Sequence, residues 1–297
     1  MEKVSYGGWP NCLRLSNGQV ELIVTTDIGP RVIRFGFVDG QNLFKKFADQ
    51  LGQTGGDEWL LYGGHRFWHA PESDPRTYYP DNVPVDYNWE SGTLKLIQSI
   101  EETTGIQKEI DITLAPDENK VTIVHRLTNR NLWAVELAPW GLTVMAQGGR
   151  AILPQEEYRS HPEYLLPARP LVLWHYTDMA DPRWIWGTKY IQLKQDPDAE
   201  TKQKVGLRNS LGWAAYCLNG DVFLKRYNCD LDAIYPDFGC NTEVYTDADM
   251  LEVESLGPLA KLQPDASVEH IEQWSLHKLE VGEDESEIDE KIPPLLT

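Results

Sequence analysis

The feature that most constrains this chain is a series of short segments in which apolar and polar residues alternate. In one of them Ile110, Ile112 and Leu114 are separated by polar residues, and alternation with a period of two places one set of side chains on each face of a β-strand. Asn219-Gly220 joins two such segments and favours a tight hairpin. No segment has the apolar spacing of an amphipathic helix of three turns. The pattern therefore predicts an all-β protein, built as an antiparallel sandwich or barrel.

Residues 1–280 are predicted to form one large domain. The chain has 297 residues and shows neither an internal repeat at a fixed period nor a linker between two folded parts. All-β domains commonly reach this size as single units. Residues 281–297 carry a run of acidic side chains, which predicts a solvated acidic tail. The acidic residues are Glu283, Asp284, Glu285, Glu287, Asp289 and Glu290.

The charge balance restricts the partners. The chain has 46 acidic against 27 basic residues and a net charge of −19. Repulsion of phosphates argues against nucleic acid and anionic membranes as partners, and without a run of about 18 apolar residues no membrane span is expected. A neutral small molecule such as a sugar is unaffected. A strongly anionic substrate is disfavoured, unless a local cluster of Arg66, Lys189 and Arg226 offsets the repulsion.

The cysteines and the missing motifs limit the chemistry. Cys12, Cys217, Cys229 and Cys240 show no C-x-x-C spacing, which leaves zinc and thioredoxin-type sites unsupported. The N-terminal residues lack the apolar core of a signal peptide, so we expect a cytoplasmic protein with reduced thiols. Neither G-x-G-x-x-G nor a P-loop is present. We expect no cofactor and no metal, and nothing in the sequence sets an oligomeric state.

The stretch from His65 to Glu72 is the richest in chemistry. It carries two imidazoles, a guanidinium, an indole and a carboxylate, and it is entered through Gly63-Gly64. The double glycine and the following Pro71 predict a loop. Planar donors beside an aromatic face suit a polyol, and function concentrates in loops held by a rigid scaffold. The alternative is a well-packed loop whose polar groups satisfy backbone carbonyls.

A second informative stretch runs from residue 250 to residue 259. In a strand, Glu252 and Glu254 share one face, and two enclosed carboxylates repel, which raises the pKa of one of them. Such a group can act as a general base or acid near neutral pH. The alternative is an ordinary solvated face. Upstream, Asp237, Asn241 and Glu243 offer oxygen ligands for Ca²⁺, but without the spacing of an EF-hand.

Together these stretches resemble the galactose mutarotase-like superfamily, the relatives of aldose 1-epimerase. The resemblance rests on the opening segment 20–44, on Gly63-Gly64-His65-Arg66, and on the segment 251–255 followed by Leu262-Gln263-Pro264-Asp265. It implies a large single-domain antiparallel β-sandwich, the supersandwich of that superfamily, with a concave face that binds sugar. It further implies that Arg66 binds sugar hydroxyls and that Glu254 is the catalytic glutamate.

The chain also departs from that family. The family carries a catalytic histidine on a mid-chain strand, but after the turn 128–131 the corresponding strand here offers Pro139-Trp140-Gly141. A second family histidine, in a His-Gly pair, is missing as well, and the comparable region is 78–82. The proton donor is therefore lost or moved, and His65 or His69 are the candidates to replace it.

The expected site follows from these residues. Glu254 is the expected base and His65 or His69 the expected acid, because opening a sugar ring needs a base on the anomeric hydroxyl and an acid on the ring oxygen. The expected sugar contacts are Arg66, Trp68, Glu72, Asp81, Trp140 and Glu252. Two alternatives stay open: a carbohydrate-binding module without catalysis, and a sugar lyase or ketose epimerase that uses the same cleft.

Overall fold

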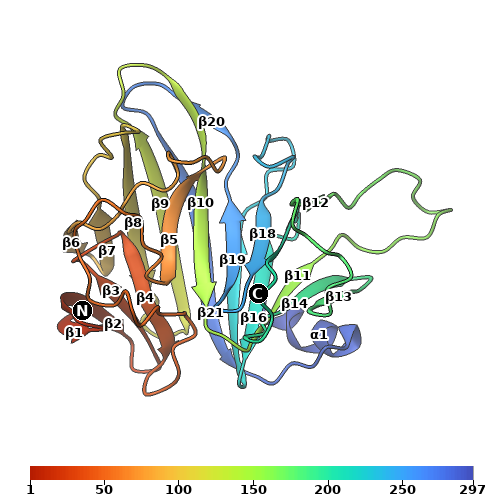
Figure 1. Cartoon of the computed structure of the whole chain (residues 1–297). Helices are drawn as coiled ribbons and strands as arrows, with labels where there is room; N and C mark the ends of the chain where they lie inside the picture. The colour runs from red at the N-terminus through yellow and green to blue at the C-terminus, as the bar shows by residue number, and fades with distance from the viewer. Residues whose placement is uncertain (297) are drawn as a thin grey trace.

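Two large antiparallel sheets pack face to face in the computed structural model, which describes residues 1–296 (Figure 1). This confirms the predicted all-β sandwich. The first sheet has the spatial order β1 (Glu2–Tyr6), β2 (Trp9–Ser16), β3 (Val20–Thr25), β4 (Arg31–Phe37), β5 (Gly64–Ala70), β10 (Val135–Met145), β19 (Leu251–Leu256), β18 (Thr242–Thr246), β15 (Gln203–Leu207) and β12 (Leu171–Leu173), with β20 (Ala260–Leu262) paired to β10.

The second sheet has ten strands, one fewer than the first. Its spatial order is β13 (Trp184–Trp186), β14 (Tyr190–Lys194), β11 (Arg150–Pro154), β16 (Trp213–Leu218), β17 (Asp221–Tyr227), β21 (Ser267–Lys278), β9 (Lys120–Asn129), β8 (Ile106–Leu114), β7 (Thr93–Ile97) and β6 (Asp86–Glu90). The predicted hairpin joins β16 to β17, where Asn219 and Gly220 have φ values of 48° and 77°. Positive φ at both turn positions is what an Asn-Gly hairpin requires.

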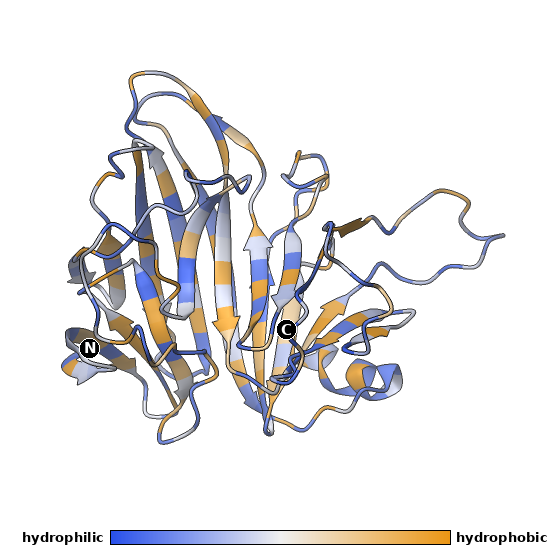
Figure 2. Cartoon of the chain, viewed as in Figure 1, coloured by the Kyte–Doolittle hydropathy of each residue, from blue (hydrophilic) through white to orange (hydrophobic). Residues whose placement is uncertain are grey.

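The main core lies between the sheets. Figure 2 shows the alternation of apolar and polar residues along the strands that produces it. At its centre Phe35 and Phe44 from the first sheet side meet Phe223 and Trp274 from the second, with ring centroids 5.6–6.1 Å apart. Aromatic pairs at this spacing, edge to face or tilted, add to the free energy gained from burial.

The stretch from Gly64 to Ala70 is a strand and not the predicted loop. It forms β5 in the middle of the first sheet, between β4 and β10, and all of its residues are buried. Gly63 and Gly64 lead into the strand at φ values of 100° and 73°, and a Cβ on Gly64 would lie 2.2 Å from Val32 O. The glycines thus permit a close approach to β4. The period of two was hidden because polar and aromatic residues occupy both faces.

The prediction of a solvated acidic tail is wrong for residues 285–296. They form helix α1 (Glu285–Lys291) and the 3₁₀ helix η1 (Pro293–Leu296). Ile288 and Ile292 are fully buried in a second apolar cluster with Trp213 and Leu224. These two isoleucines are four residues apart and so share one helix face, while the acidic side chains occupy the others. Thr297, the last residue of that expected tail, lies outside the described residues.

Two further findings concern the whole described chain. Cys12, Cys217, Cys229 and Cys240 are all free, as the sequence predicts. Within residues 1–296, no helix combines the length and the apolar composition that crossing a membrane would take.

Candidate functional site

Three adjacent strands of the first sheet, β5, β10 and β19, align the expected site residues. In their register Trp140 lies opposite Trp68, and Leu142 lies opposite both Arg66 and Glu254. Glu252 precedes Glu254 by two residues on β19 and therefore shares its face. The side chains of Ser255 and His65, which are next in sequence to Glu254 and Arg66, contact the second sheet. Because successive side chains of a strand alternate between faces, Arg66 and Glu254 point away from the second sheet. We call this side the outer face of the first sheet.

Lys204 of β15 joins two glutamates on the outer face. Its Nζ lies 2.7 Å from Glu243 Oε2 and 3.1 Å from Glu254 Oε2. Trp140 Nε1 donates a hydrogen bond of 2.9 Å to Glu254 Oε2. Glu243 and Glu254 face each other across the β18–β19 pair and are both fully buried. One ammonium is thus shared by two carboxyl groups in a place that excludes water.

Burial sets the protonation of this group. It raises the pKa of Glu243 well above its ordinary value, and the nearby Glu254 adds to the rise while Lys204 opposes it. The pKa of Glu254 is raised less, also by burial. Burial disfavours the charge on Lys204, but Glu243 and Glu254 outweigh it and hold the pKa of Lys204 well above the usual range. Of the two coupled carboxyl groups, Glu243 is therefore the one that holds a proton more readily, and Glu254 is the one more readily ionised beside the ammonium.

A cavity of about 370 Å³ opens next to this group, and we call it the outer-face cavity. Its size lies in the range of small-molecule sites. Glu243 Oε1 borders this region without a hydrogen-bond partner, and Glu254 Oε1 also lacks one. Both oxygens are therefore short of a hydrogen-bond partner, and Glu243 is the one of the two residues that lines the cavity. The cavity is lined by Glu72, Ser73, Asp74, Tyr78, Trp140, Trp174, Asp237 and Glu243.

Arg66 lies on the same face but is already engaged. Its Nη1 lies 2.8 Å from Glu252 Oε1, and its guanidinium carbon lies 4.5 Å from the centre of the Trp68 ring. Trp68 in turn contacts Trp140 and Tyr78 edge to face. These contacts hold the arginine and the indoles in fixed orientations beside the cavity. Arg66 Nε has no hydrogen-bond partner and remains available as a donor.

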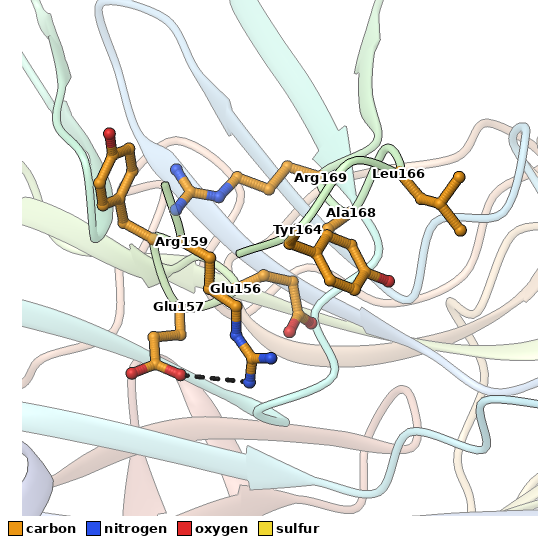
Figure 3. Close-up of a pocket in the computed structure, with 8 residues that line it drawn as sticks. Glu156, Glu157, Arg159, Tyr164, Leu166, Ala168 and Arg169 are labelled. Carbon is orange, nitrogen blue, oxygen red and sulfur yellow. Dashed lines mark hydrogen bonds and ion pairs between the residues drawn. The ribbon is translucent and has the colours of Figure 1, made fainter. Parts of the chain in front are cut away.

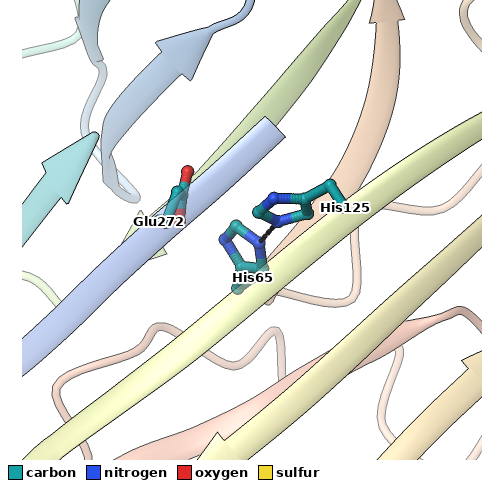
Figure 4. Close-up of side chains that lie close together, drawn as sticks. All are labelled: His65, His125 and Glu272. Atoms are coloured by element: carbon teal, nitrogen blue, oxygen red, sulfur yellow. Dashed lines mark hydrogen bonds between the residues drawn. The ribbon is translucent and has the colours of Figure 1, made fainter. Parts of the chain in front are cut away.

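His65 does not join this group, because it points from β5 into the space between the sheets (Figure 4). Its Nε2 lies 2.7 Å from His125 Nε2, and its Nδ1 lies 2.9 Å from Thr143 Oγ1. His125 Nδ1 lies 3.0 Å from His270 O, which accepts its proton. His65 Nε2 is then the donor to His125, and the Thr143 hydroxyl donates to His65. Burial lowers the pKa values of His65 and His125, so a neutral, satisfied chain of hydrogen bonds results.

Metal ions in proteins are bound by clusters of histidine, cysteine, aspartate and glutamate. Within residues 1–296, one cluster of three or more such side chains has its ligand atoms within 4.8 Å of one another, and it consists of His65, His125 and Glu272. They do not fit a metal ion. Two imidazoles on one zinc ion hold their nitrogens roughly 3.3 Å apart at Zn–N distances of about 2.0–2.1 Å, which is wider than the hydrogen-bond distance found here. Glu272 is moreover occupied by Ser255, Trp274 and Lys225. A cation would have to displace these donors beside an existing ammonium.

His69 and Asp81 also lie away from the outer-face cavity. His69 shares the inner face of β5 with His65; its Nδ1 lies 2.5 Å from Arg76 Nη1 and its Nε2 3.3 Å from Glu101 Oε2. It borders a different cavity of about 540 Å³. Asp81 forms an ion pair of 2.8 Å with the buried Arg31. The structure thus brings Glu254, Arg66, Trp68, Trp140 and Glu252 together, adds Glu72 through the cavity wall, and separates His65, His69 and Asp81 from them.

A further hollow lies on the segment between β11 and β12, which projects from the body of the protein in Figure 1. Figure 3 shows its side chains, all from this one segment. None of them is buried, so the surroundings do not fix their orientations as a precise site requires. The lining residues are Glu156, Glu157, Tyr158, Arg159, Tyr164, Leu166, Ala168 and Arg169.

Sequence reasoning missed Lys204 and Trp174 and considered Glu243 only as a calcium ligand. Lys204 was overlooked because a lysine inside a strand ordinarily points to solvent. One signal was available: Glu243 and Tyr245 alternate with apolar residues in the same way as Glu252 and Glu254, so both strands carry acids on one face. Which of these strands are neighbours depends on the sheet order and could not be read from the pattern.

Comparison with known proteins identifies the fold. No family model and no curated protein matches the chain by sequence. A putative aldose 1-epimerase from Klebsiella pneumoniae subsp. pneumoniae MGH 78578 superposes with a TM-score of 0.61 at 12% identity, covering 97% of this chain and 84% of that chain. A galactose mutarotase-like protein from Lactobacillus casei ATCC 334 gives a TM-score of 0.59 at 11% identity and coverages of 90% and 100%.

A third solved structure, the Slr1438 protein from Synechocystis sp. PCC 6803, gives a TM-score of 0.58 at 12% identity, with 94% of this chain and 100% of that chain covered. At identities this low, structural likeness establishes the architecture and leaves the chemistry to the site itself.

Proposed function

Since the chain has the galactose mutarotase-like fold, we propose that it binds an aldose in the outer-face cavity and interconverts the two anomers of that sugar by acid–base catalysis. The observation that carries the proposal is the pair of buried carboxyl groups on Glu243 and Glu254. They flank one ammonium, differ in their pKa values, and each keep an oxygen without a hydrogen-bond partner. Two titratable groups whose surroundings separate their pKa values are suited to acting as acid and base.

The two glutamates divide the work. Glu254, held as a carboxylate by Lys204 and Trp140, removes the proton of the anomeric hydroxyl. Glu243 donates its proton to the ring oxygen, the bond from that oxygen to the anomeric carbon breaks, and the open-chain aldehyde forms. After rotation about the adjacent carbon–carbon bond, the reverse proton transfers close the ring as the other anomer. Both glutamates return to their starting states, and no oxidant or cofactor enters the balance.

The cavity wall supplies binding. Trp140 and Trp174 offer indole faces on which an apolar sugar face can stack, and Tyr78 OH together with Glu72, which it contacts, offers hydroxyl partners. Arg66 remains the candidate donor to a sugar oxygen through its unpartnered Nε. In this proposal Glu243 takes the acid role that the sequence assigned to His65 or His69, because both histidines lie on the inner face of β5.

The test is the rate at which freshly dissolved aldoses reach anomeric equilibrium, followed by polarimetry. We expect acceleration by the protein, a loss of about 10²–10⁴ in rate for Glu254→Gln and a similar loss for Glu243→Gln, because an amide neither accepts nor supplies the proton. Glu252→Gln should cost much less. The matched control is Glu118→Gln, an exposed residue at a distant turn. Full activity in Glu254→Gln would remove Glu254 from the role of base.

A second candidate function is carbohydrate binding without turnover. It is favoured by the complete burial of Glu254 and by its two existing partners, which restrict its access to a sugar. In that case nuclear magnetic resonance titration would show saturable binding of an aldose, while polarimetry would show no acceleration by the same preparation.

A further inference from the structure

The walls of the outer-face cavity carry an unbalanced charge. Four acidic side chains line it, Glu72, Asp74, Asp237 and Glu243, and none of its lining residues is a lysine or an arginine. The nearest cations are already paired: Lys204 with Glu243 and Glu254, and Arg66 with Glu252. Beyond these pairs Glu72, Asp74 and Asp237 remain without a basic partner among the lining residues. Low-dielectric walls concentrate such a field inside a cavity.

A buried acceptor independently points to a missing donor. Glu243 is fully buried and lines the cavity, yet its Oε1 accepts no hydrogen bond. A buried polar atom without a hydrogen-bond partner costs free energy. A ligand in the cavity that donates a hydrogen bond to this atom would remove that cost. Asp237 lies close enough to Glu243 for the protonated glutamic acid to hydrogen-bond to it. Burial raises the pKa of Asp237, while Lys204 and this contact with Glu243 oppose the rise.

An ammonium group of the chain itself, that of Lys204, is already bound next to the outer-face cavity. Lys204 Nζ lies 5.0 Å from the centre of the Trp140 ring and 4.7 Å from that of Trp174, between two glutamates. Indole faces and carboxylates together are the usual surroundings of bound ammonium groups. The wall of the cavity offers the same kinds of group, an aromatic ring on Tyr78 and carboxyl groups on Glu72, Asp74 and Asp237. No lysine or arginine side chain is among its lining residues.

A metal ion does not fit this charge. Within residues 1–296, only the interior group of His65, His125 and Glu272 brings such ligand atoms within 4.8 Å of one another. No three acids of the outer-face cavity therefore lie close enough together to form a cage of protein ligands around one ion, whose oxygen ligands lie at about 2.0–2.6 Å. An organic cation that spans the cavity can reach several of them at once.

We propose that the outer-face cavity selects an aldose that carries a free ammonium group, a hexosamine, over neutral, N-acylated and phosphorylated sugars. The proposal rests on the proposed function for the placement of the sugar ring and adds the chemistry of one substituent. The ammonium lies among Glu72, Asp74 and Asp237, and the ring packs against Trp140 and Trp174. A phosphate or carboxylate in the same place would meet acids without a compensating base.

The experiment compares binding of glucosamine, glucose, N-acetylglucosamine and glucose 6-phosphate by calorimetry at constant ionic strength. Hydrogen bonds to charged groups contribute enough free energy that we expect glucosamine to bind about ten-fold or more tightly than glucose. N-acetylglucosamine should lose that advantage, and the phosphate ester should bind more weakly than glucose. Ethanolamine controls for attraction of any cation to this acidic protein and should not compete with glucosamine at equal concentration.

Substitutions locate the effect. Asp237→Asn and Asp74→Asn should each reduce the ratio of glucosamine to glucose affinity several-fold, whereas Asp117→Asn, at an exposed turn of the second sheet, should leave the ratio unchanged. Equal or tighter binding of glucose relative to glucosamine would overturn the inference and leave the proposed function standing. Failure of every sugar in the panel to bind would overturn the proposed function, and this inference with it.

Discussion

Two buried lysine–glutamate groups adjoin the two faces of the first sheet: Lys225 and Glu272 of the second sheet pack against its inner face, and Lys204, Glu243 and Glu254 lie on its outer face. At the inner face Glu272 Oε1 meets Lys225 Nζ at 3.0 Å and Ser255 Oγ at 2.6 Å, while Oε2 accepts from Trp274 Nε1 at 2.6 Å. On the outer face one ammonium serves two glutamates, and two carboxyl oxygens have no partner. Both oxygens of Glu272 at the inner face thus have a hydrogen-bond donor, whereas Glu243 and Glu254 on the outer face each have one oxygen without a donor.

The difference appears in the pKa values. Burial alone would raise the pKa of Glu272, but Lys225 and the surrounding groups outweigh burial and lower it. For Glu243 burial is the dominant effect and raises the pKa. A saturated buried acid contributes to stability, whereas an acid short of donors is available to a ligand or a reacting proton. The comparison predicts a structural role for the inner face and a functional one for the outer face.

The largest expected effect separates the two lysines. Lys225→Met leaves Glu272 buried beside other fixed partners without its ammonium, and loss of one partner from a buried ion pair costs about 3–5 kcal/mol of the free energy of unfolding. Lys204→Met should cost clearly less, because Glu243 and Glu254 can take up protons beside the cavity. Urea denaturation of both variants at pH 7 measures the difference. Equal losses would contradict the distinction between the faces.

A smaller effect is expected at Gly141, which lies between the two groups on β10. An added Cβ would lie 2.4 Å from Glu272 Oε1 and 3.4 Å from His65 Cε1. Forcing a methyl group into a packed interior typically costs about 1–3 kcal/mol, and Gly141→Ala should fall in this range. Gly257→Ala is the control, because its nearest neighbour is Pro139 Cδ at 3.1 Å. Thermal or urea unfolding compares the two.

The inner face should also make stability depend on acid. Burial lowers the pKa values of His65 and His125 below the ordinary value, and that of His270 to about 3. The unfolded chain therefore binds more protons below about pH 6.5, so the free energy of unfolding falls as the pH falls. Each such histidine contributes a slope of about 1.4 kcal/mol per pH unit.

The His270→Gln variant tests this slope. It removes one titrating group while an amide can still bond to Ser255, which His270 contacts at 2.7 Å. Its stability, measured by urea denaturation between about pH 6.5 and pH 5, should decline less steeply than that of the parent. An unchanged slope would mean that His270 is not a neutral buried group.

The smallest effect is of opposite sign and belongs to the outer face. The pKa of Glu243 is raised in the folded protein, so the folded state binds the extra proton and loses stability as the pH rises from about 4.5 toward that raised pKa. Glu243→Gln removes this loss and should stabilise the protein at neutral pH by about 1 kcal/mol, at the expense of activity. A destabilised variant at pH 7 would argue against a site short of donors.

The sequence by itself determined the local structure that depends on neighbouring residues. Alternation specified the strands, Asn219-Gly220 specified a hairpin, and the spacing of Glu252 and Glu254 placed both on one face, because each of these follows from the geometry of a few successive residues. The segments that resemble the galactose mutarotase-like superfamily extended this to the sandwich, which the structural comparison confirms.

Only the tertiary structure decided what each face meets. The order of strands in the sheet brings Lys204 and Glu243 to Glu254 from segments about 50 and 11 residues away in sequence. It also turns β5 so that Arg66 lies on the outer face while His65 and His69 lie on the inner face. Long-range pairing of strands follows from the burial of the whole core and not from any local pattern. In the proposed function the acid is therefore Glu243 of β18, which pairs with β19, and not a histidine next to Arg66 in sequence.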